Sequence, residues 1–360
     1  MDLPRYLIIA AIAALSFMLL TEWVAFSEQR ATGPAPAATT QVAPPIVDEA
    51  VPGGIDASEL PTAAAADEDV PEVPSESAPS TPAAAPVASA STLQVSTDVL
   101  EVTIDLNGGD ITRVALPRHL ARQDEPDVPF VLLQQDQQRT YVAQSGLVGP
   151  DGIDAGGRAE FTSVRSSYEL SDGTDELIVN LAWAAQGEVE ITKRFTFRRG
   201  DYLVDVDYLV NNRSGTRWQA NLFGQIKRDN SPDPSQSLSG GMGLVPFLGV
   251  ALTQPDERFT KFDFEEMAEK PFKQQLAGGW IAMIQHYFLS AWIPDPAQTH
   301  TFSTRVTRSG YNIGGFTSPA LVVDPGNSGS TGARFYAGPK DQYRPVSYTH
   351  LTLPTIPFEC

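Results

Sequence analysis

The feature that most constrains the fold is a long, uncharged run rich in aromatic residues. It reads GGWIAMIQHYFLSAWIP, spans Gly278 to Pro294, and contains no lysine, arginine, aspartate or glutamate. Periodicity alone does not separate a buried helix from two buried strands in such a run. The flanking glycines and proline favour two short strands joined by a turn near Gln285 and His286. Large rings dominate any core they enter, so we predict that this run is the centre of a large β core.

Alternating apolar and polar residues from Thr92 onward predict many more strands. The pattern LQVSTDVLEVTIDL predicts one half-buried strand over Leu93–Leu106, followed by a hairpin-type turn in the letters NGG at 107–109. The turn signals recur at short spacing, which predicts a large antiparallel sandwich. Segment 256–268 fits a short helix or a strand. Further strands are expected over 110–116, 130–134, 140–143, 160–170, 176–183, 188–198, 202–211, 218–227, 301–307, 311–316, 320–323 and 333–337.

An uncharged stretch close to the N-terminus predicts a membrane anchor over residues 6–26. A helix needs about 20 residues to cross a bilayer, and this stretch is long enough if Glu22 lies near the headgroups. Tyr6, Trp23 and Phe26 lie where aromatic anchors meet the membrane surface. The alternative is a cleaved signal peptide, which would have a shorter apolar region and a nearby small-x-small site. We favour the anchor, with residues 1–5 in the cytoplasm.

Two segments lack the pattern of a folded domain. Residues 27–91 are rich in alanine, proline and acidic residues and almost without aromatic residues, which predicts a disordered linker. The tail over 345–360 contains SYTHLTLPTI, which resembles translated sequencing adapter and is suspect as native sequence. The folded domain is therefore expected over residues 92–344.

Charge and cysteine content narrow the class of protein. The formal net charge is −19, which argues against a nucleic-acid partner because phosphate binding needs clustered basic residues. Cys360 is the only cysteine, so neither an intrachain disulfide nor a cysteine-based metal site is expected. No metal box or phosphate-binding loop stands out, and we expect no cofactor.

One constellation suggests chemistry on a sugar. His286 lies between Trp280 and Trp292 in sequence, and a sugar-processing site would pair a histidine with a carboxylate as general acid and base. No spacing links His286 to a particular carboxylate. We favour the simpler interpretation, a turn histidine flanked by core aromatics.

Three other groups have simple structural interpretations. The acids in FDFEEMAEK lack the loop pattern of a calcium site and fit a solvated face. The basic residues over 193–199 could touch lipid headgroups, although alternation on an exposed strand explains them equally well. The Asn212-Arg213-Ser214 sequon carries little weight by itself.

Several segments together resemble one known family. They include the N-terminal MDLPRYLIIAAIAALSFMLLTEW, then STDVLEVTIDLNGGDI, KRFTFRRGDYLVDVDYLVNN, FDFEEMAEK, GGWIAMIQHYFLSAWIP and FTSPALVVDPG, in that order. The chain resembles the YidC/Oxa/Alb family of bacterial membrane protein insertases in its long Gram-negative form, represented here by the first membrane span and the periplasmic domain.

The resemblance implies a β-supersandwich similar to galactose mutarotases, in the periplasm of a protein anchored in the inner membrane. It implies no enzyme activity and no cofactor. It implies three partners: nascent integral membrane proteins, the Sec translocon with its accessory subunits, and membrane lipids. In the family, insertion resides in further membrane helices that have no match in this chain. A membrane-anchored carbohydrate-binding or mutarotase-like domain is the alternative function, and a spacer that docks partner proteins is a third.

Overall fold

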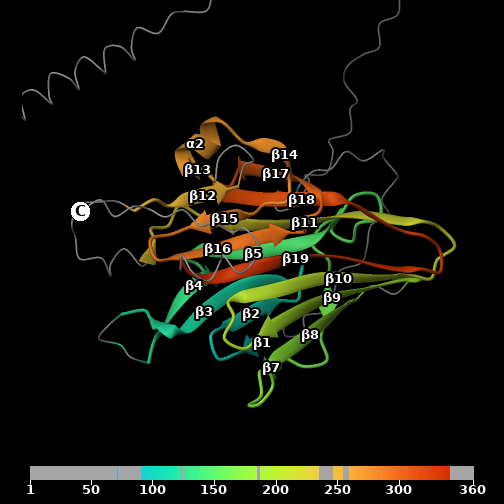
Figure 1. The fold of residues 1–360 in the computed structure, drawn as a ribbon, viewed down its shortest axis with the longest axis horizontal. Coiled ribbons are helices and arrows are strands. Elements are labelled where there is room, and N and C mark those ends of the chain that lie inside the picture. The colour runs from blue at the N-terminus through green and yellow to red at the C-terminus, as the bar shows by residue number, and fades with distance from the viewer. Residues whose placement is uncertain are drawn as a thin grey trace, which may run out of the picture. The chain divides into compact units, whose positions relative to one another are not determined.

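The computed structural model describes residues 71, 91–122, 125, 127–184, 187–234, 246–253 and 259–340. The predicted anchor, the linker up to Ala90 with the exception of Pro71, and the tail lie outside these residues. Within the described part of the chain, no helix has the length and apolar character that a membrane crossing requires. Every described strand belongs to one of two sheets (Figure 1).

The first sheet has ten strands in the order β14, β17, β18, β11, β5, β4, β3, β2, β1 and β7. Its described pairings are antiparallel, except that β1 and β7 run parallel. In sheet order the strands span Lys273–Ala277, Thr299–Val306, Asn312–Val323, Trp218–Arg228, Thr140–Val148, Pro129–Gln135, Asp110–Leu120, Glu101–Asp105, Thr92–Ser96 and Ser167–Glu169.

The second sheet has nine strands in the order β13, β12, β15, β16, β19, β10, β9, β8 and β6. In Figure 1, β8, β9 and β10 lie side by side. The six-residue helix α2, Phe264–Glu269, follows β13 and is the sole α-helix among the described residues. In sheet order the strands span Thr260–Asp263, Gly249–Leu252, Ile281–Ile284, Phe288–Pro294, Ser328–Pro339, Leu203–Asn212, Val189–Arg198, Glu176–Trp183 and Phe161–Thr162.

The two sheets enclose one hydrophobic core, as an antiparallel sandwich requires. Hydrogen bonds cross from one sheet to the other within it. The Tyr141 hydroxyl on β5 lies 2.8 Å from the Ser290 hydroxyl on β16, and Trp292 Nε1 donates to the Gln225 carbonyl on β11 at 3.1 Å. The predicted sandwich is confirmed.

The aromatic run forms the hairpin that the sequence predicts. Strands β15 and β16 pair antiparallel, with Ile281 opposite Trp292 and Ile284 opposite Leu289. Every residue of both strands is buried. The Gln285 amide closes the turn by donating to the Phe288 carbonyl at 2.9 Å. Uniform burial removes the alternation that usually marks a strand, which is why flanking residues had to decide the prediction.

Three of the predicted strand boundaries were wrong. The single strand over Leu93–Leu106 is two strands, β1 and β2, because the Thr97 hydroxyl accepts the Leu100 amide at 2.9 Å and stabilises a turn. The strand over 160–170 is likewise divided into β6 and β7, whereas the two predicted over 311–316 and 320–323 are the continuous β18. The described part of segment 256–268 contains both a strand and a short helix, because β13 is followed by α2.

Candidate functional site

The structure does not bring together the three residues of the suggested sugar site. Trp280 precedes β15 and Trp292 pairs with its first residue, whereas His286 lies in the turn at the other end of the hairpin. A strand rises about 3.3 Å per residue, so the turn lies on the order of 10–15 Å from Trp280. The tryptophans are 3% and 1% exposed, which places both rings inside the core. The described geometry therefore does not favour a sugar site here.

His286 has the surroundings of a turn residue. Its backbone amide donates to Asp233 Oδ2 at 2.8 Å, and its ring meets the Tyr287 ring edge-on with centroids 4.0 Å apart. Burial and the nearby Lys340 cation lower the pKa of the imidazole, against a smaller opposing effect of Asp233. These contacts stabilise the turn.

The other described histidines are also part of the packing. His300 is 1% exposed, and its ring nitrogens contact the Ser318 hydroxyl at 3.0 Å and the Asp295 carbonyl at 2.7 Å. His119 Nε2 lies 3.1 Å from the Tyr202 hydroxyl. Burial lowers the pKa of both imidazoles. Both therefore fit a structural role better than a catalytic one.

The sequon and the acidic segment have structural roles. Asn212 is fully buried, and its side-chain amide donates to the Thr216 carbonyl at 2.8 Å and the Val323 carbonyl at 2.9 Å. Asp263 caps α2 by accepting the Glu266 amide at 2.7 Å. No group of three or more metal-ligating side chains occurs among the described residues.

The basic group over 193–199 contains one residue that the sequence analysis misjudged. Lys193 was taken as part of an exposed or lipid-facing group, but its side chain is fully buried and points into the sandwich from β9. Its neighbour Arg194 faces the opposite way, where Nε donates to Asn180 Oδ1 at 3.0 Å. Alternation along a strand gives the two residues opposite faces, and Lys193 takes the position of an apolar residue.

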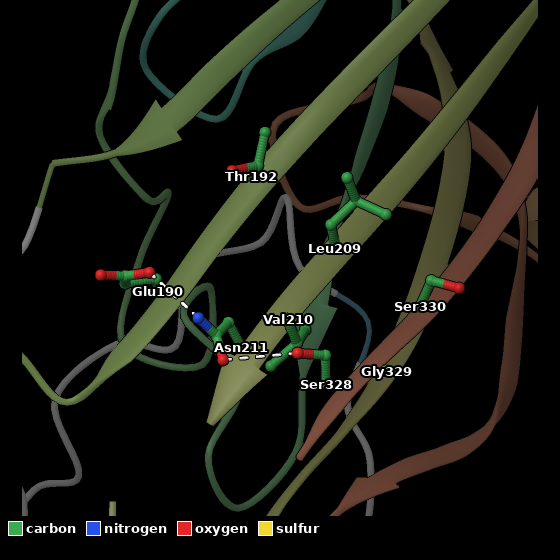
Figure 2. A pocket seen from close by; sticks show the side chains of 8 residues that line it. All are labelled: Glu190, Thr192, Leu209, Val210, Asn211, Ser328, Gly329 and Ser330. Carbon is green, nitrogen blue, oxygen red and sulfur yellow. Dashed lines mark hydrogen bonds between the residues drawn. The ribbon is translucent and has the colours of Figure 1, made fainter. Parts of the chain in front are cut away.

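A shallow groove crosses the outer face of the second sheet (Figure 2). It has a volume of about 370 Å³, at the lower end of the range for small-molecule sites. Its floor consists of rows of residues that face each other across β9, β10 and β19. The lining residues are Glu190, Thr192, Leu209, Val210, Asn211, Ser328, Gly329 and Ser330.

Hydrogen bonds organise one end of this outer groove. Asn211 Nδ2 donates to Glu190 Oε2 at 3.2 Å, and the Ser328 hydroxyl donates to Asn211 Oδ1 at 3.3 Å, as the dashed lines in Figure 2 show. A second hollow continues it toward β8 and β6, sharing Thr192 and Leu209 with the first. Its remaining lining residues are Thr162, Ser163, Val164, Asn180, Ala182 and Arg194.

The chemistry of the outer groove suits binding better than catalysis. Hydroxyl and amide side chains line it together with the charged Glu190 and Arg194, and the apolar residues are Leu209, Val210, Val164 and Ala182. The lining contains no histidine, cysteine or lysine, and a nucleophile needs an adjacent base. Donors and acceptors spaced along paired strands fit an extended polar segment of another chain. Because these side chains are spread over five strands and a loop, only the folded register reveals the groove.

Comparison with known proteins identifies relatives along most of the chain. The family described as "YidC periplasmic domain" matches residues 92–353. The membrane protein insertase YidC of Cellvibrio japonicus is 43% identical over 350 residues, which cover 96% of this chain and 59% of that relative. The protein of the same name from Stutzerimonas stutzeri is 40% identical over 343 residues, covering 95% and 59%. The chain thus spans about three fifths of the length of the curated relatives that it matches.

Solved structures similar to this chain include a galactose mutarotase related enzyme from Lactobacillus acidophilus, with a TM-score of 0.43 and 11% identity over 68% of this chain and 97% of that one. A putative aldose 1-epimerase from Escherichia coli has a TM-score of 0.40 and 11% identity, covering 68% and 98%.

Proposed function

This chain belongs to the YidC family of membrane protein insertases, and from that membership we propose that it forms the N-terminal part of such an insertase. The complete protein would insert integral proteins into the inner membrane and help them fold, both with the Sec translocon and without it. The observation that carries this proposal is identity of about 40% along 95% of the chain to proteins named as insertases. The alternative of a carbohydrate-binding domain is not favoured.

The proposed topology follows the chain in order. Residues 1–5 lie in the cytoplasm, residues 6–26 cross the inner membrane, and the linker over 27–91 leads to a periplasmic domain that starts at Thr92. The description of the matching family as a periplasmic domain supports the placement of the sandwich. The linker composition supports a tether between membrane and sandwich. Alkaline-phosphatase fusions after residue 30 and after residue 91 would both be active under this topology, whereas an inactive fusion at either point would contradict it.

The proposed role of the sandwich is to hold partner proteins. The outer groove supplies hydrogen-bonding groups on a surface without a nucleophile and base, which supports docking of an extended polar segment. The Sec accessory subunits and nascent membrane proteins are the expected partners. Moving a charged side chain into a bilayer costs a few kcal/mol or more. In the family, the membrane helices lower this cost, and the periplasmic domain does not.

Depletion of the resident insertase in bacterial cells tests the insertase proposal. A gene that joins this chain to the membrane helices of a relative should restore insertion of a client protein, because the fused product contains both parts. The present chain alone should not restore it. Rescue by the chain alone, or failure of the fused gene despite normal expression and membrane localisation, would contradict the proposal.

Site-specific cross-linking tests the docking role. With Cys360→Ser as background, Leu209→Cys places a thiol in the outer groove, and Val322→Cys places one on β18 of the other sheet as a control. We expect cross-links to Sec accessory subunits or client chains from position 209 and few from position 322. Equal cross-linking yields from both positions would show that the outer groove is not the docking surface. The insertase proposal would be unaffected.

A further inference from the structure

The turn between β2 and β3 is held by two buried basic side chains. Arg158 donates to the Gly108 carbonyl at 3.2 Å and to the Ser145 carbonyl at 2.9 Å. Lys193 Nζ donates to the same two carbonyls, at 3.0 Å and 3.1 Å. Together they tie the turn to β5, and Lys193 reaches it from the opposite sheet. This arrangement links the two layers of the sandwich at one point.

The glycines of the NGG turn are required by this close approach. Gly108 and Gly109 have φ values of 87° and 62°, a region that L side chains rarely adopt. A Cβ at Gly108 would lie 2.5 Å from the Arg158 side chain, and a Cβ at Gly109 would lie 2.8 Å from the Lys193 side chain. The turn therefore has room for the two basic side chains only because positions 108 and 109 are glycine.

Two buried carboxylates lie beside Arg158. Arg158 pairs with Asp110, and with Asp154 at 2.9 Å. Asp154 also accepts the backbone amides of Leu147 at 2.8 Å and Ala159 at 3.1 Å. Asp110 further accepts from the Gln144 amide at 2.9 Å. We call the four charged residues Lys193, Arg158, Asp110 and Asp154 the turn clamp.

Lys193 differs from its partners in having no direct carboxylate contact. Among the described residues no carboxylate oxygen lies within ion-pair distance of its Nζ. The rings of Phe161, Phe195 and Tyr208 surround it, with centroids at 6.0, 5.4 and 5.3 Å. A neutral amine retains two N–H donors, which is the number of carbonyls that Lys193 bonds. Both protonation states thus satisfy the hydrogen bonds, and only the buried charge differs.

We propose that Lys193 is a proton-binding switch for the turn clamp, such that binding a proton favours opening of the turn at 107–109 and of the loop at 149–159. An ammonium group is costly to bury without a direct counter-charge. A neutral amine is not. Opening gives the ammonium access to water, so protonation stabilises the open form relative to the closed one.

The direction of the pH dependence follows from the surrounding groups. Burial lowers the pKa of Lys193 to about 7, with Arg158 acting in the same direction and Asp110 and Asp154 opposing it. Tyr208 stays neutral, because burial raises its pKa well above 10. Asp105, on β2 at the edge of the clamp, has its pKa raised chiefly by burial.

The size of the effect follows from the difference in pKa between the closed and open forms. In the open, hydrated form the ordinary pKa of 10.5 applies. The open form therefore binds more protons between pH 7 and pH 10.5, and opening grows as pH falls through that window and levels off below pH 7. The two pKa values predict an opening constant about 50-fold larger at pH 7 than at pH 9.

Hydrogen exchange of the full chain tests the switch. The amides of Gly108 and Ala159 report on the clamp, because Gly108 donates to the Ala159 carbonyl at 2.7 Å and Ala159 donates to Asp154. After correction for intrinsic exchange rates, their opening should increase about 50-fold from pH 9 to pH 7 in the wild type. The Gln285 amide, in the distant hairpin turn, should show no such increase. Lys193→Gln should abolish the dependence.

Two outcomes would overturn the switch. One is a wild-type opening constant that does not change between pH 7 and pH 9. The other is an unchanged slope in Lys193→Gln.

A direct titration covers the case in which Lys193→Gln fails to fold. The chain has six lysines, so 13Cε-lysine labelling gives few NMR signals. Burial also lowers the pKa of Lys340, whose signal is removed with Lys340→Arg. We expect one remaining signal with a midpoint near pH 7, assigned to Lys193. Midpoints near the ordinary lysine value for all remaining signals would overturn the proposal.

Discussion

The β15–β16 hairpin and the turn clamp are both buried, but different forces stabilise them. The hairpin strands are apolar at every position except Ser290, whose hydroxyl is hydrogen-bonded to Tyr141, and they bury no charge. The turn clamp places an arginine, a lysine and two carboxylates inside the sandwich, where the charges of Arg158, Asp110 and Asp154 depend on one another. The hairpin should therefore lose stability in proportion to the side-chain volume that a substitution removes. The clamp should lose much of its stability when a single charged partner is removed.

The largest expected effect comes from breaking the clamp at Asp154. Asp154→Ala leaves Arg158 with one fewer carboxylate and orphans the amides of Leu147 and Ala159. Removal of one partner from a buried charge network typically costs about 3–5 kcal/mol. Urea unfolding followed by circular dichroism measures the loss. Exposed ion pairs usually contribute no more than about 1 kcal/mol. A loss smaller than this would show that the clamp is hydrated in solution and behaves like a surface ion pair.

A cavity in the hairpin should have the next largest effect. Leu289 is fully buried on β16, opposite Ile284. Leu289→Ala removes its contacts and leaves a void, at a cost of about 2–5 kcal/mol in the free energy of unfolding. The same urea titration applies. Unlike the clamp variants, this one should lose the same stability at pH 7 and pH 9; a pH-dependent loss would mean that the two regions are coupled.

A smaller substitution in the same hairpin tests whether the loss of stability scales with the volume removed. Ile284→Val removes one methylene from a side chain that is 3% exposed. Such a change costs about 0.5–1.5 kcal/mol in a packed core. The ratio of this loss to that of Leu289→Ala, measured in parallel, tests whether hairpin stability scales with volume. Equal losses would indicate that Leu289 repacks without leaving a cavity.

The smallest effect is expected at an exposed ion pair. Arg217 Nε lies 2.9 Å from Asp324 Oδ1, with side chains 67% and 56% exposed. Arg217→Ala should change stability by about 0.2–1 kcal/mol at low salt and less as salt is added, because solvent and ions screen such pairs. Thermal unfolding at two salt concentrations measures this. A larger, salt-independent loss would show that the pair is effectively buried.

The same contrast explains what the sequence could predict. Alternation and turn residues were sufficient to predict an antiparallel sandwich, most of its strands and the central hairpin, because apolar burial leaves a periodic signal. Lys193 was misjudged because one buried lysine among apolar positions looks like part of a basic surface group. Its partners Asp110, Asp154 and Arg158 come from a strand end and a loop far from it in sequence.

The outer groove was not predicted for a related reason. Its lining residues are ordinary polar side chains with Glu190, Leu209, Val210 and Gly329 among them, and they form no motif in the sequence. Their grouping depends on the pairing of β10 with both β9 and β19. The β9–β10 pairing is local, but the pairing of β10 with the distant β19 is fixed by tertiary structure and not by local pattern.

The position of β19 has a consequence for the order of folding. This strand, Ser328–Pro339, pairs with both β10 and β16 and so joins two parts of the second sheet. β18 is similarly late in the chain and completes the first sheet beside β11. Closing such long loops is slow, and strands that await their partners present open edges to other chains. The ribosome must therefore synthesise nearly the whole domain before either sheet is complete. The nascent chain is most prone to aggregation in the interval before β19 emerges.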